Sequence, residues 1–397
     1  MTSSGNARRA YCTILARNYL PKAMTLADSL RRHHDTDLVV LLIDVASDDQ
    51  LPKLPGVRLV STAGLGLSDR EVLRLAMSYA LVEFATAVKP LLLKRLLEDH
   101  DEAYYLDPDL YVTAPMVELS PALQASEGGI ILTPHFLRPP AADAPLTEGH
   151  VLSVGIFNLG FCGVDRRASA FLDWWWGKLR NECLFDPLSG LFVDQKWVDV
   201  GASLFRAATL RHAGYNTSVA NLQERPLAED ADGFVVSSTG DRLRLFHFHA
   251  FDTDAVGELS TRYDWSTAHM RDSSTAVEHL CREYGSALRE WEERLPRPDY
   301  CYTHDARGRR IRRILRRVYR VQSQHADLPS PFVPAESAAY DQWRRRAWRA
   351  AARSLLGDAV KTARSSLPDE TRQLQDRFPR LMGRMRDSTV ERIGGWG

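Results

Sequence analysis

Segments with strand and helix patterns alternate over the first hundred residues. Residues 11–15 and 38–43 are short apolar runs, and the second is typical of a strand buried on both faces. Residues 19–32, between them, carry apolar side chains at helical spacing. Strands separated by helices predict an α/β fold with a mostly parallel, doubly wound sheet.

The charge of the chain is divided unevenly along its length. The 397 residues are 44% hydrophobic and 26% charged, which excludes a disordered, collagen-like or disulfide-framework protein. The formal net charge is zero, but residues 301–397 hold 21 Lys and Arg against 10 Asp and Glu, including eight arginines in residues 307–320. An acidic body with a basic C-terminal part follows, and no nucleic-acid-binding motif accompanies the arginines.

The cysteines and the lengths of the apolar runs indicate the cellular compartment of the protein. Five cysteines are scattered without C-x-x-C spacing, which fits reduced thiols better than a zinc site or a disulfide framework. No apolar segment approaches the roughly 20 residues that span a bilayer, and no signal-peptide pattern follows the N-terminus. We therefore expect a soluble, cytoplasmic protein.

The sharpest local motif is the pair Asp107 and Asp109, separated by one proline. It follows a short strand pattern at residues 104–106, so both carboxylates are expected at the carboxyl end of a sheet, where open α/β folds bind ligands. Oxygen ligands of this kind suit Mg²⁺ or Mn²⁺ bridging a nucleotide diphosphate. An ordinary turn with exposed acids is the alternative for the pair taken alone.

Further segments surround this motif in a characteristic order. They are residues 11–29, 83–90, 105–112, 157–160, 194–195 and 246–250. Together they resemble the GT-A fold glycosyltransferases, Rossmann-like in architecture, and most closely glycosyltransferase family 8, whose members retain anomeric configuration and use a nucleotide sugar. The resemblance covers roughly residues 10–255.

The resemblance implies roles for particular residues. Asp107, Asp109 and His247 match the metal ligands, with Mn²⁺ or Mg²⁺ as the implied cofactor. Binding of the nucleotide sugar is implied for Thr13, Asn18, Tyr19, Lys89, Asp107 and Gly160. Asn158, Asp194 and Gln195 match the catalytic positions beside the transferred sugar.

The chain departs from the family pattern after His247. Family members continue H-x-x-G into x-x-K-P-W, but Ala250 replaces the glycine and Thr253 stands at the position of the phosphate-binding lysine. The diphosphate then needs another cation, and Lys89, Arg17 or the arginines of residues 307–320 are candidates. His249 is expected beside His247 on one face of a strand.

These observations predict a metal-dependent hexosyltransferase that retains configuration and transfers a sugar from a nucleotide-diphosphate donor to an unknown acceptor, such as a saccharide, a natural product or a protein. The expected domains are a nucleotide-sugar-binding catalytic domain at residues 1–255, a helical, Arg-rich C-terminal part of that catalytic domain at 256–330 and a helical basic tail at 331–397. The Arg-rich part is a candidate contact with a membrane surface or another anion. Two alternatives stay open: a haloacid dehalogenase-type phosphatase with Asp107 as nucleophile, and a non-catalytic nucleotide-sugar-binding or scaffold protein.

Overall fold

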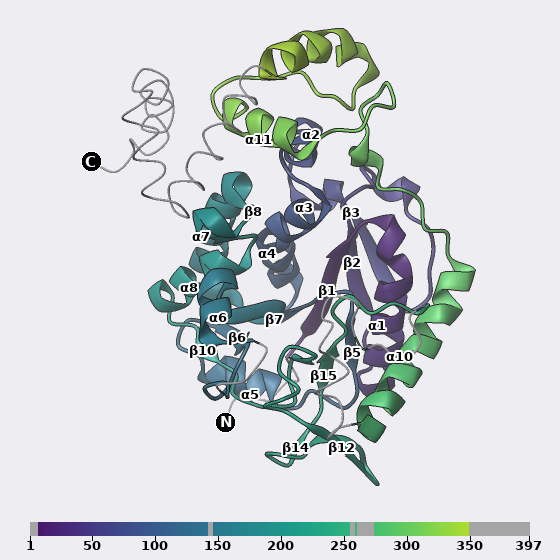
Figure 1. The fold of residues 1–397 in the computed structure, drawn as a ribbon, viewed down its shortest axis with the longest axis vertical. Helices are drawn as coiled ribbons and strands as arrows, with labels where there is room; N and C mark the ends of the chain where they lie inside the picture. Colours follow the sequence, from purple (N-terminus) through teal and green to yellow (C-terminus); the bar gives the residue numbers. More distant parts are fainter. Residues whose placement is uncertain (1–6, 142–145, 255–258, 260–273, 349–397) are drawn as a thin grey trace, which may run out of the picture. The chain divides into compact units, whose positions relative to one another are not determined.

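The computed structural model describes residues 7–141, 146–254, 259 and 274–348 (Figure 1). The chain divides into two compact units. The first contains residues 1–72 and 81–301, and the second contains residues 73–80 and 302–397.

The first unit is built on a seven-stranded sheet in the order β10-β6-β7-β4-β1-β2-β3. The strands are β1 (Arg9–Leu15), β2 (Leu38–Leu42), β3 (Val57–Ser61), β4 (Glu102–Leu106), β6 (Ile130–Pro134), β7 (Phe157–Asp165) and β10 (Ala208–Thr209). All neighbours pair in parallel except β7, which is antiparallel to both β4 and β6. The predicted α/β class with a mostly parallel sheet is confirmed.

Helices lie on both faces of this sheet (Figure 1). The helices of the first unit are α1 (Leu20–His33), α3 (Leu81–Ala87), α4 (Lys89–Asp99), α5 (Leu119–Ala125), α6 (Glu148–Val154), α7 (Ser169–Glu182), α8 (Gln195–Leu204) and α10 (Ser274–Arg294). Most of α2 (Asp69–Ser78), from residue 73 on, belongs to the second unit. Short 3-10 helices occur at Arg17–Tyr19, Asp48–Gln50, Thr62–Leu65, Arg166–Ala168, Pro187–Ser189, Cys301–Thr303 and Pro334–Glu336. Apolar side chains of α1 pack on those of β1, β2 and β4, and their burial stabilises this layer.

Smaller sheets complete the first unit. One has the order β11-β15-β5 and consists of β11 (Thr217–Ser218), β15 (Leu245–His247) and β5 (Leu110–Val112). The others contain β12 (Leu227–Asp230), β13 (Gly233–Val236) and β14 (Asp241–Arg242), and the pair β8 (Phe185–Asp186) and β9 (Leu191–Phe192). Since β15 pairs antiparallel with β5, with His247 opposite Leu110, the histidine comes beside the carboxyl end of β4.

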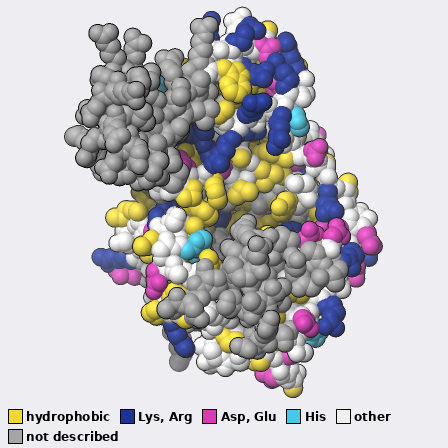
Figure 2. All heavy atoms as spheres, viewed as in Figure 1, with side chains coloured by type: hydrophobic (Ala, Val, Ile, Leu, Met, Phe, Trp, Pro, Cys, Tyr) yellow, Lys and Arg dark blue, Asp and Glu magenta, His cyan; other side chains and the backbone are white. Residues whose placement is uncertain are grey.

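The second unit has its own apolar core. It contains α11 (Arg313–Gln322) and a helical segment at residues 337–348, in accordance with the predicted helical C-terminal region. Met77, Leu315 and Tyr340 are buried in this core. Lys and Arg side chains gather over the unit in Figure 2.

One arginine of the segment at residues 307–320 is buried and makes hydrogen bonds within the second unit. Arg316 is 5% exposed and donates to the carbonyls of Ala76 at 2.5 Å, Tyr79 at 3.0 Å and Tyr302 at 2.5 Å. The chain ends α2 at Ser78 and begins α3 at Leu81, so residues 70–88 do not form a single helix. The Tyr79 carbonyl accepts from the Arg316 guanidinium where a continuous helix would need it for residue 83.

No helix among the described residues has the length and apolar character needed to cross a membrane.

Candidate functional site

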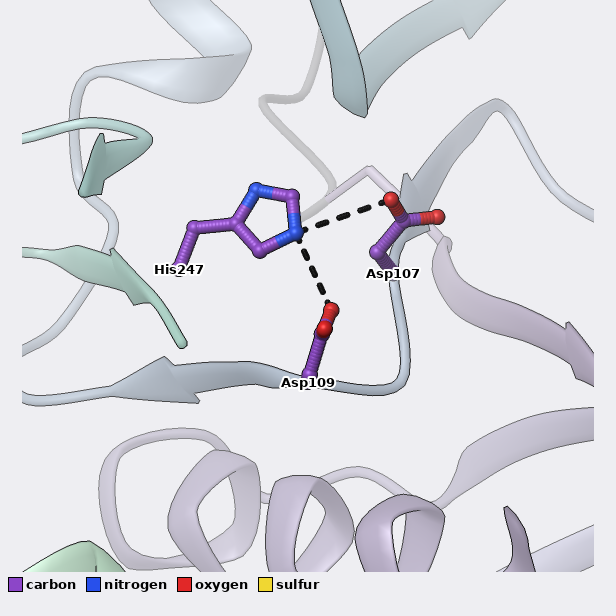
Figure 3. Close-up of side chains that lie close together, drawn as sticks. All are labelled: Asp107, Asp109 and His247. Atoms are coloured by element: carbon purple, nitrogen blue, oxygen red, sulfur yellow. Dashed lines mark ion pairs between the residues drawn. The ribbon is translucent and has the colours of Figure 1, made fainter. Parts of the chain in front are cut away.

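Three side chains converge at the carboxyl end of β4 (Figure 3). Asp107 and Asp109 lie in the turn between β4 and β5, and His247 ends β15. The His247 Nε2 atom lies 3.0 Å from Asp109 Oδ1 and 3.7 Å from Asp107 Oδ2. One ligand atom from each residue lies within 4.8 Å of the others, a spacing that could hold a metal ion.

Backbone hydrogen bonds hold the turn in place. The Asp107 amide donates to the Gly160 carbonyl at 2.8 Å, and the Leu110 amide donates to the Asp107 carbonyl at 3.0 Å. The Phe248 amide donates to the Asp109 carbonyl at 2.9 Å. The two carboxylates are therefore fixed by main-chain contacts to both β7 and the end of β15, which is how segments far apart in sequence form one site.

Asn216 determines which nitrogen of His247 faces the carboxylates. The Asn216 Nδ2 atom donates to Thr133 Oγ1 and to the Asn158 carbonyl, both at 2.9 Å, so its Oδ1 must act as an acceptor. His247 Nδ1 lies 2.9 Å from that oxygen and carries the proton. The Nε2 atom, on the other side of the ring, therefore faces Asp107 and Asp109.

Gly160 makes room for the imidazole. A Cβ atom at this position would lie 2.3 Å from His247 Cε1 and 2.6 Å from Nδ1, so a side chain there would displace the ring. The Gly160 amide donates to Asn158 Oδ1 at 3.0 Å. Gly160 thus packs against the His247 ring, and Asn158 contacts Gly160.

The charge environment of Asp109 favours its ionised form. Burial by itself would raise the pKa of this carboxyl, but the charge and hydrogen bond of His247 outweigh burial, and Lys22 and His249 add to the effect. The pKa of Asp109 is lowered as a result. The His249 ring lies beside that of His247, with ring centroids 3.6 Å apart and the planes tilted by 50°. The two were predicted on one face of a strand, but β15 ends at His247 and His249 lies beyond it.

Lys89 and Asp194 form a buried ion pair. Their side chains are 1% and 3% exposed, and Lys89 Nζ lies 2.5 Å from Asp194 Oδ2. Lys89 also donates to the Leu159 carbonyl at 3.0 Å and lies 3.9 Å from the centroid of the Tyr105 ring. Burial would lower the pKa of Lys89, but Asp194 and then Asp107 outweigh it and raise that pKa. Tyr105 links the pair to the metal-type site, since its hydroxyl donates to Asp107 at 2.7 Å.

The Gln195 amide is fully engaged by its surroundings. Its Oε1 accepts from the Leu159 amide at 3.1 Å, and its Nε2 donates to the Val154 carbonyl at 2.9 Å. The same Nε2 lies 3.2 Å from His135 Nε2, which accepts in the neutral imidazole. Burial, with the added charge of His150, lowers the pKa of His135 to about 3.

The three nucleotide-binding residues predicted at β1 and the loop after it differ in solvent exposure. Thr13 lies within β1 and is fully buried, and its Oγ1 has no hydrogen-bond partner among the described residues. Asn18 is half-buried, and its buried Oδ1 likewise has no partner in the part of the chain that is described. Tyr19 is 41% exposed at the start of α1. Asn18 and Tyr19 are thus closer to solvent than Thr13.

Two of the predicted substitute cations already have partners. Lys89 is paired as described, and Arg17 Nε lies 3.2 Å from Asp44 Oδ2, while its backbone amide also donates to that carboxylate. Thr253, at the position of the family lysine, donates to Glu292 on α10 at 2.8 Å. Ala250, at the family glycine, has a φ of +52°, a left-handed conformation that glycine adopts without strain.

Sequence reasoning missed Asn216, Lys22 and His135. Asn216 has a φ of +55°, and asparagine is among the few residues that tolerate this conformation, but nothing in the residues around it signals a partner 31 positions away. The sequence patterns identified the carboxylates and His247 and left the residues that orient them unnamed.

The fold and site define an α/β protein with two carboxylates and one imidazole at the carboxyl edge of its sheet. No family model matches the chain. It is 26% identical over 277 residues to the uncharacterized protein YfnF of Bacillus subtilis (strain 168), covering 66% of this chain and 89% of the relative.

Similar solved structures include two glycosyltransferases. The bifunctional glycosyltransferase WbbM, in its apo form, gives a TM-score of 0.36 at 14% identity, covering 72% of this chain and 53% of the other, so this chain spans about half of WbbM. The galactosyltransferase LgtC, solved with donor and acceptor sugar analogues, gives a TM-score of 0.40 at 15% identity, covering 72% of this chain and 100% of LgtC.

Proposed function

We propose that the protein is a metal-dependent glycosyltransferase of the GT-A type. It takes a sugar from a nucleotide-diphosphate donor and transfers it to an acceptor with retention of configuration, as the resemblance to glycosyltransferase family 8 implies. The observation that carries the proposal is the convergence of two carboxylates on the His247 Nε2 atom. Two carboxylates against one imidazole leave negative charge at this point even when the imidazole is protonated, and a bound cation would offset it.

The residues present fit a divalent metal ion. Asp107, Asp109 and His247 would hold it, and Asn216 orients the imidazole in the way that ligating histidines usually require. Two oxygen donors and one nitrogen donor favour Mn²⁺, with Mg²⁺ as the second choice. When bound, the ion would act as a Lewis acid on the diphosphate leaving group.

The nucleoside would bind at the loop after β1. Asn18 offers a buried carbonyl oxygen without a protein partner among the described residues, and Tyr19 offers an exposed ring. We propose that these two residues contact ribose and base. Thr13 would support the loop from within β1, because its side chain is fully buried.

The transferred sugar would lie near Asn158, Gln195 and Asp194. All three are buried and hydrogen-bonded or ion-paired within the protein. We propose that they shape the sugar pocket, and that Lys89 acts by holding Asp194 in place. An acceptor that attacks from the face of the departing nucleotide needs no protein base in a retaining enzyme of this family.

We further propose that the catalytic domain is residues 1–255, followed by the helical Arg-rich part at 256–330 and the basic tail at 331–397. The scattered, odd-numbered cysteines support a cytoplasmic location. The basic C-terminal part would contact an anionic acceptor or membrane surface.

The proposal is tested by release of nucleoside diphosphate from a panel of nucleotide sugars, with Mn²⁺ or with a chelator. We expect metal-dependent release from one donor class, and loss of that release in Asp107→Asn. An asparagine keeps the hydrogen bond from Tyr105 but removes the charge. Asp232→Asn is the matched control, because that side chain is 89% exposed at the β12–β13 turn and should not affect release.

The outcomes separate the alternatives. Release of inorganic phosphate in place of nucleoside diphosphate would indicate the phosphatase. Binding of a nucleotide sugar without turnover, in the presence of every acceptor class tried, would indicate a non-catalytic binding protein. Either result would overturn the proposed transferase activity.

A further inference from the structure

The site as described lacks an evident cation for a diphosphate. A nucleoside diphosphate would approach two carboxylates, and a single divalent ion does not offset the charge of both groups. The family supplies a lysine, but Thr253 occupies that position and donates to Glu292. Lys89 and Arg17 are bound to Asp194 and Asp44.

Lys22 lies at the same edge of the sheet. It is in the first turn of α1, which begins at the carboxyl end of β1, the strand next to β4. The hydrogen bond from the Val112 amide to Ser29 Oγ, at 3.1 Å, fixes α1 against β5. Lys22 lies seven residues before Ser29 on the helix, and Asp109 lies three residues before Val112. Each of these steps covers about 10 Å, so Lys22 and Asp109 are expected at a similar height.

A further observation agrees with this placement. A helix in the pale purple of the N-terminal region passes beneath the strand that carries Asp109 in Figure 3.

The ammonium group of Lys22 is available to a ligand. The side chain is half-buried, and Nζ lies 5.2 Å from the centroid of the Tyr19 ring. Within the described ranges, no carboxylate lies within ion-pair distance of Lys22, in contrast to Lys89 and Arg17. A cation resting on an exposed aromatic ring can be transferred to a phosphate at little cost, because such contacts contribute only about 0.5–1 kcal/mol at exposed sites.

We propose that Lys22 is the cation that binds the donor diphosphate in this protein, in place of the lysine missing at position 253. This inference rests on the proposed function, since it assumes that the diphosphate lies between Asp109 and the start of α1. Lys22 would contact the phosphate oxygens and contribute to donor affinity, while the metal ligands remain those described above.

The test uses inorganic pyrophosphate, which has the two phosphates of the donor but no nucleoside. Its affinity therefore does not depend on contacts between Tyr19 and a base. Affinity for pyrophosphate in the presence of Mn²⁺ is measured by calorimetry on the full chain. Lys22→Met should weaken it by about tenfold or more, and Lys22→Arg should restore most of it. Affinity for Mn²⁺ alone should stay equal or increase, because the substitution removes a neighbouring positive charge.

Lys178→Met is the matched control. Lys178 is also half-buried on a helix, and its Nζ lies 5.2 Å from the Trp197 ring, so the substitution removes the same kind of contact away from the site. Its pyrophosphate affinity should equal that of the parent. Equal affinity in Lys22→Met and the parent would overturn the role of Lys22 alone. Failure of the parent to bind pyrophosphate with Mn²⁺ would overturn the proposed function and this inference with it.

Discussion

Two charged clusters lie close together in the first unit, and they differ in what they lack. The Lys89–Asp194 pair is buried and electrically complete, because each charge has its counterion at 2.5 Å. The cluster of Asp107, Asp109 and His247 has two carboxylates against one imidazole. The first cluster is balanced by its own charges, whereas the second carries excess negative charge that a bound cation would offset.

The largest effect is expected from breaking the complete cluster. Lys89→Met would leave Asp194 buried without a counterion and should lower the free energy of unfolding by about 3–5 kcal/mol. Denaturant unfolding measures the change. The double variant Lys89→Met/Asp194→Asn should recover part of the loss. If Lys89→Met were as stable as the parent, Lys89 would not be the counterion that Asp194 requires.

A smaller loss of stability, with a loss of binding, is expected from Gly160→Ala. The added Cβ would displace the His247 ring, costing about 1–3 kcal/mol and removing Mn²⁺ binding. Calorimetric titration with Mn²⁺ tests the binding. The control is Gly177→Ala on α7, where no atom lies within 4 Å of the new Cβ and helix propensity should give a small gain in stability.

The orientation of His247 is tested through Asn216. Asn216→Ala removes the acceptor for Nδ1 and should weaken Mn²⁺ binding by about 10–100-fold, as loss of an outer hydrogen bond to a ligand does. Asn216→Asp keeps the acceptor and should retain most of the affinity. Equal weakening in the two variants would point to loss of the Thr133 and Asn158 contacts as the cause.

The smallest effect concerns Ala250. Its φ of +52° is unfavourable for a residue with a side chain, so Ala250→Gly should increase the free energy of unfolding by about 1 kcal/mol or less. The gain is small because glycine also increases the entropy of the unfolded chain. Equilibrium unfolding measures this change. A clear loss of stability would show that the alanine methyl group makes contacts that outweigh the strain.

The sequence predicted the elements whose signal is local. The apolar run of residues 38–43 and the helical spacing of residues 19–32 correspond to β2 and α1, since burial on both faces or along one stripe leaves a periodic pattern. The two aspartates and His247 were also identified, and the structure brings them together.

Features that depend on distant partners were not predicted. The break between α2 and α3 coincides with a hydrogen bond to the Tyr79 carbonyl from Arg316, more than 200 residues away. The sequence likewise did not predict the ion pair of Lys89 with Asp194. In each case the deciding partner is set by the packing of the unit, which no local pattern encodes.

The central claim is that the cluster of Asp107, Asp109 and His247 binds a divalent cation. The most direct measurement is titration of the full chain with Mn²⁺, following the paramagnetic signal of the free ion, in the parent, Asp109→Asn and Asp232→Asn. The account predicts one bound ion in the parent and in Asp232→Asn, and a loss of affinity greater than about a hundredfold in Asp109→Asn with an unchanged circular dichroism spectrum. Equal Mn²⁺ binding by all three proteins, or none by the parent, would contradict it.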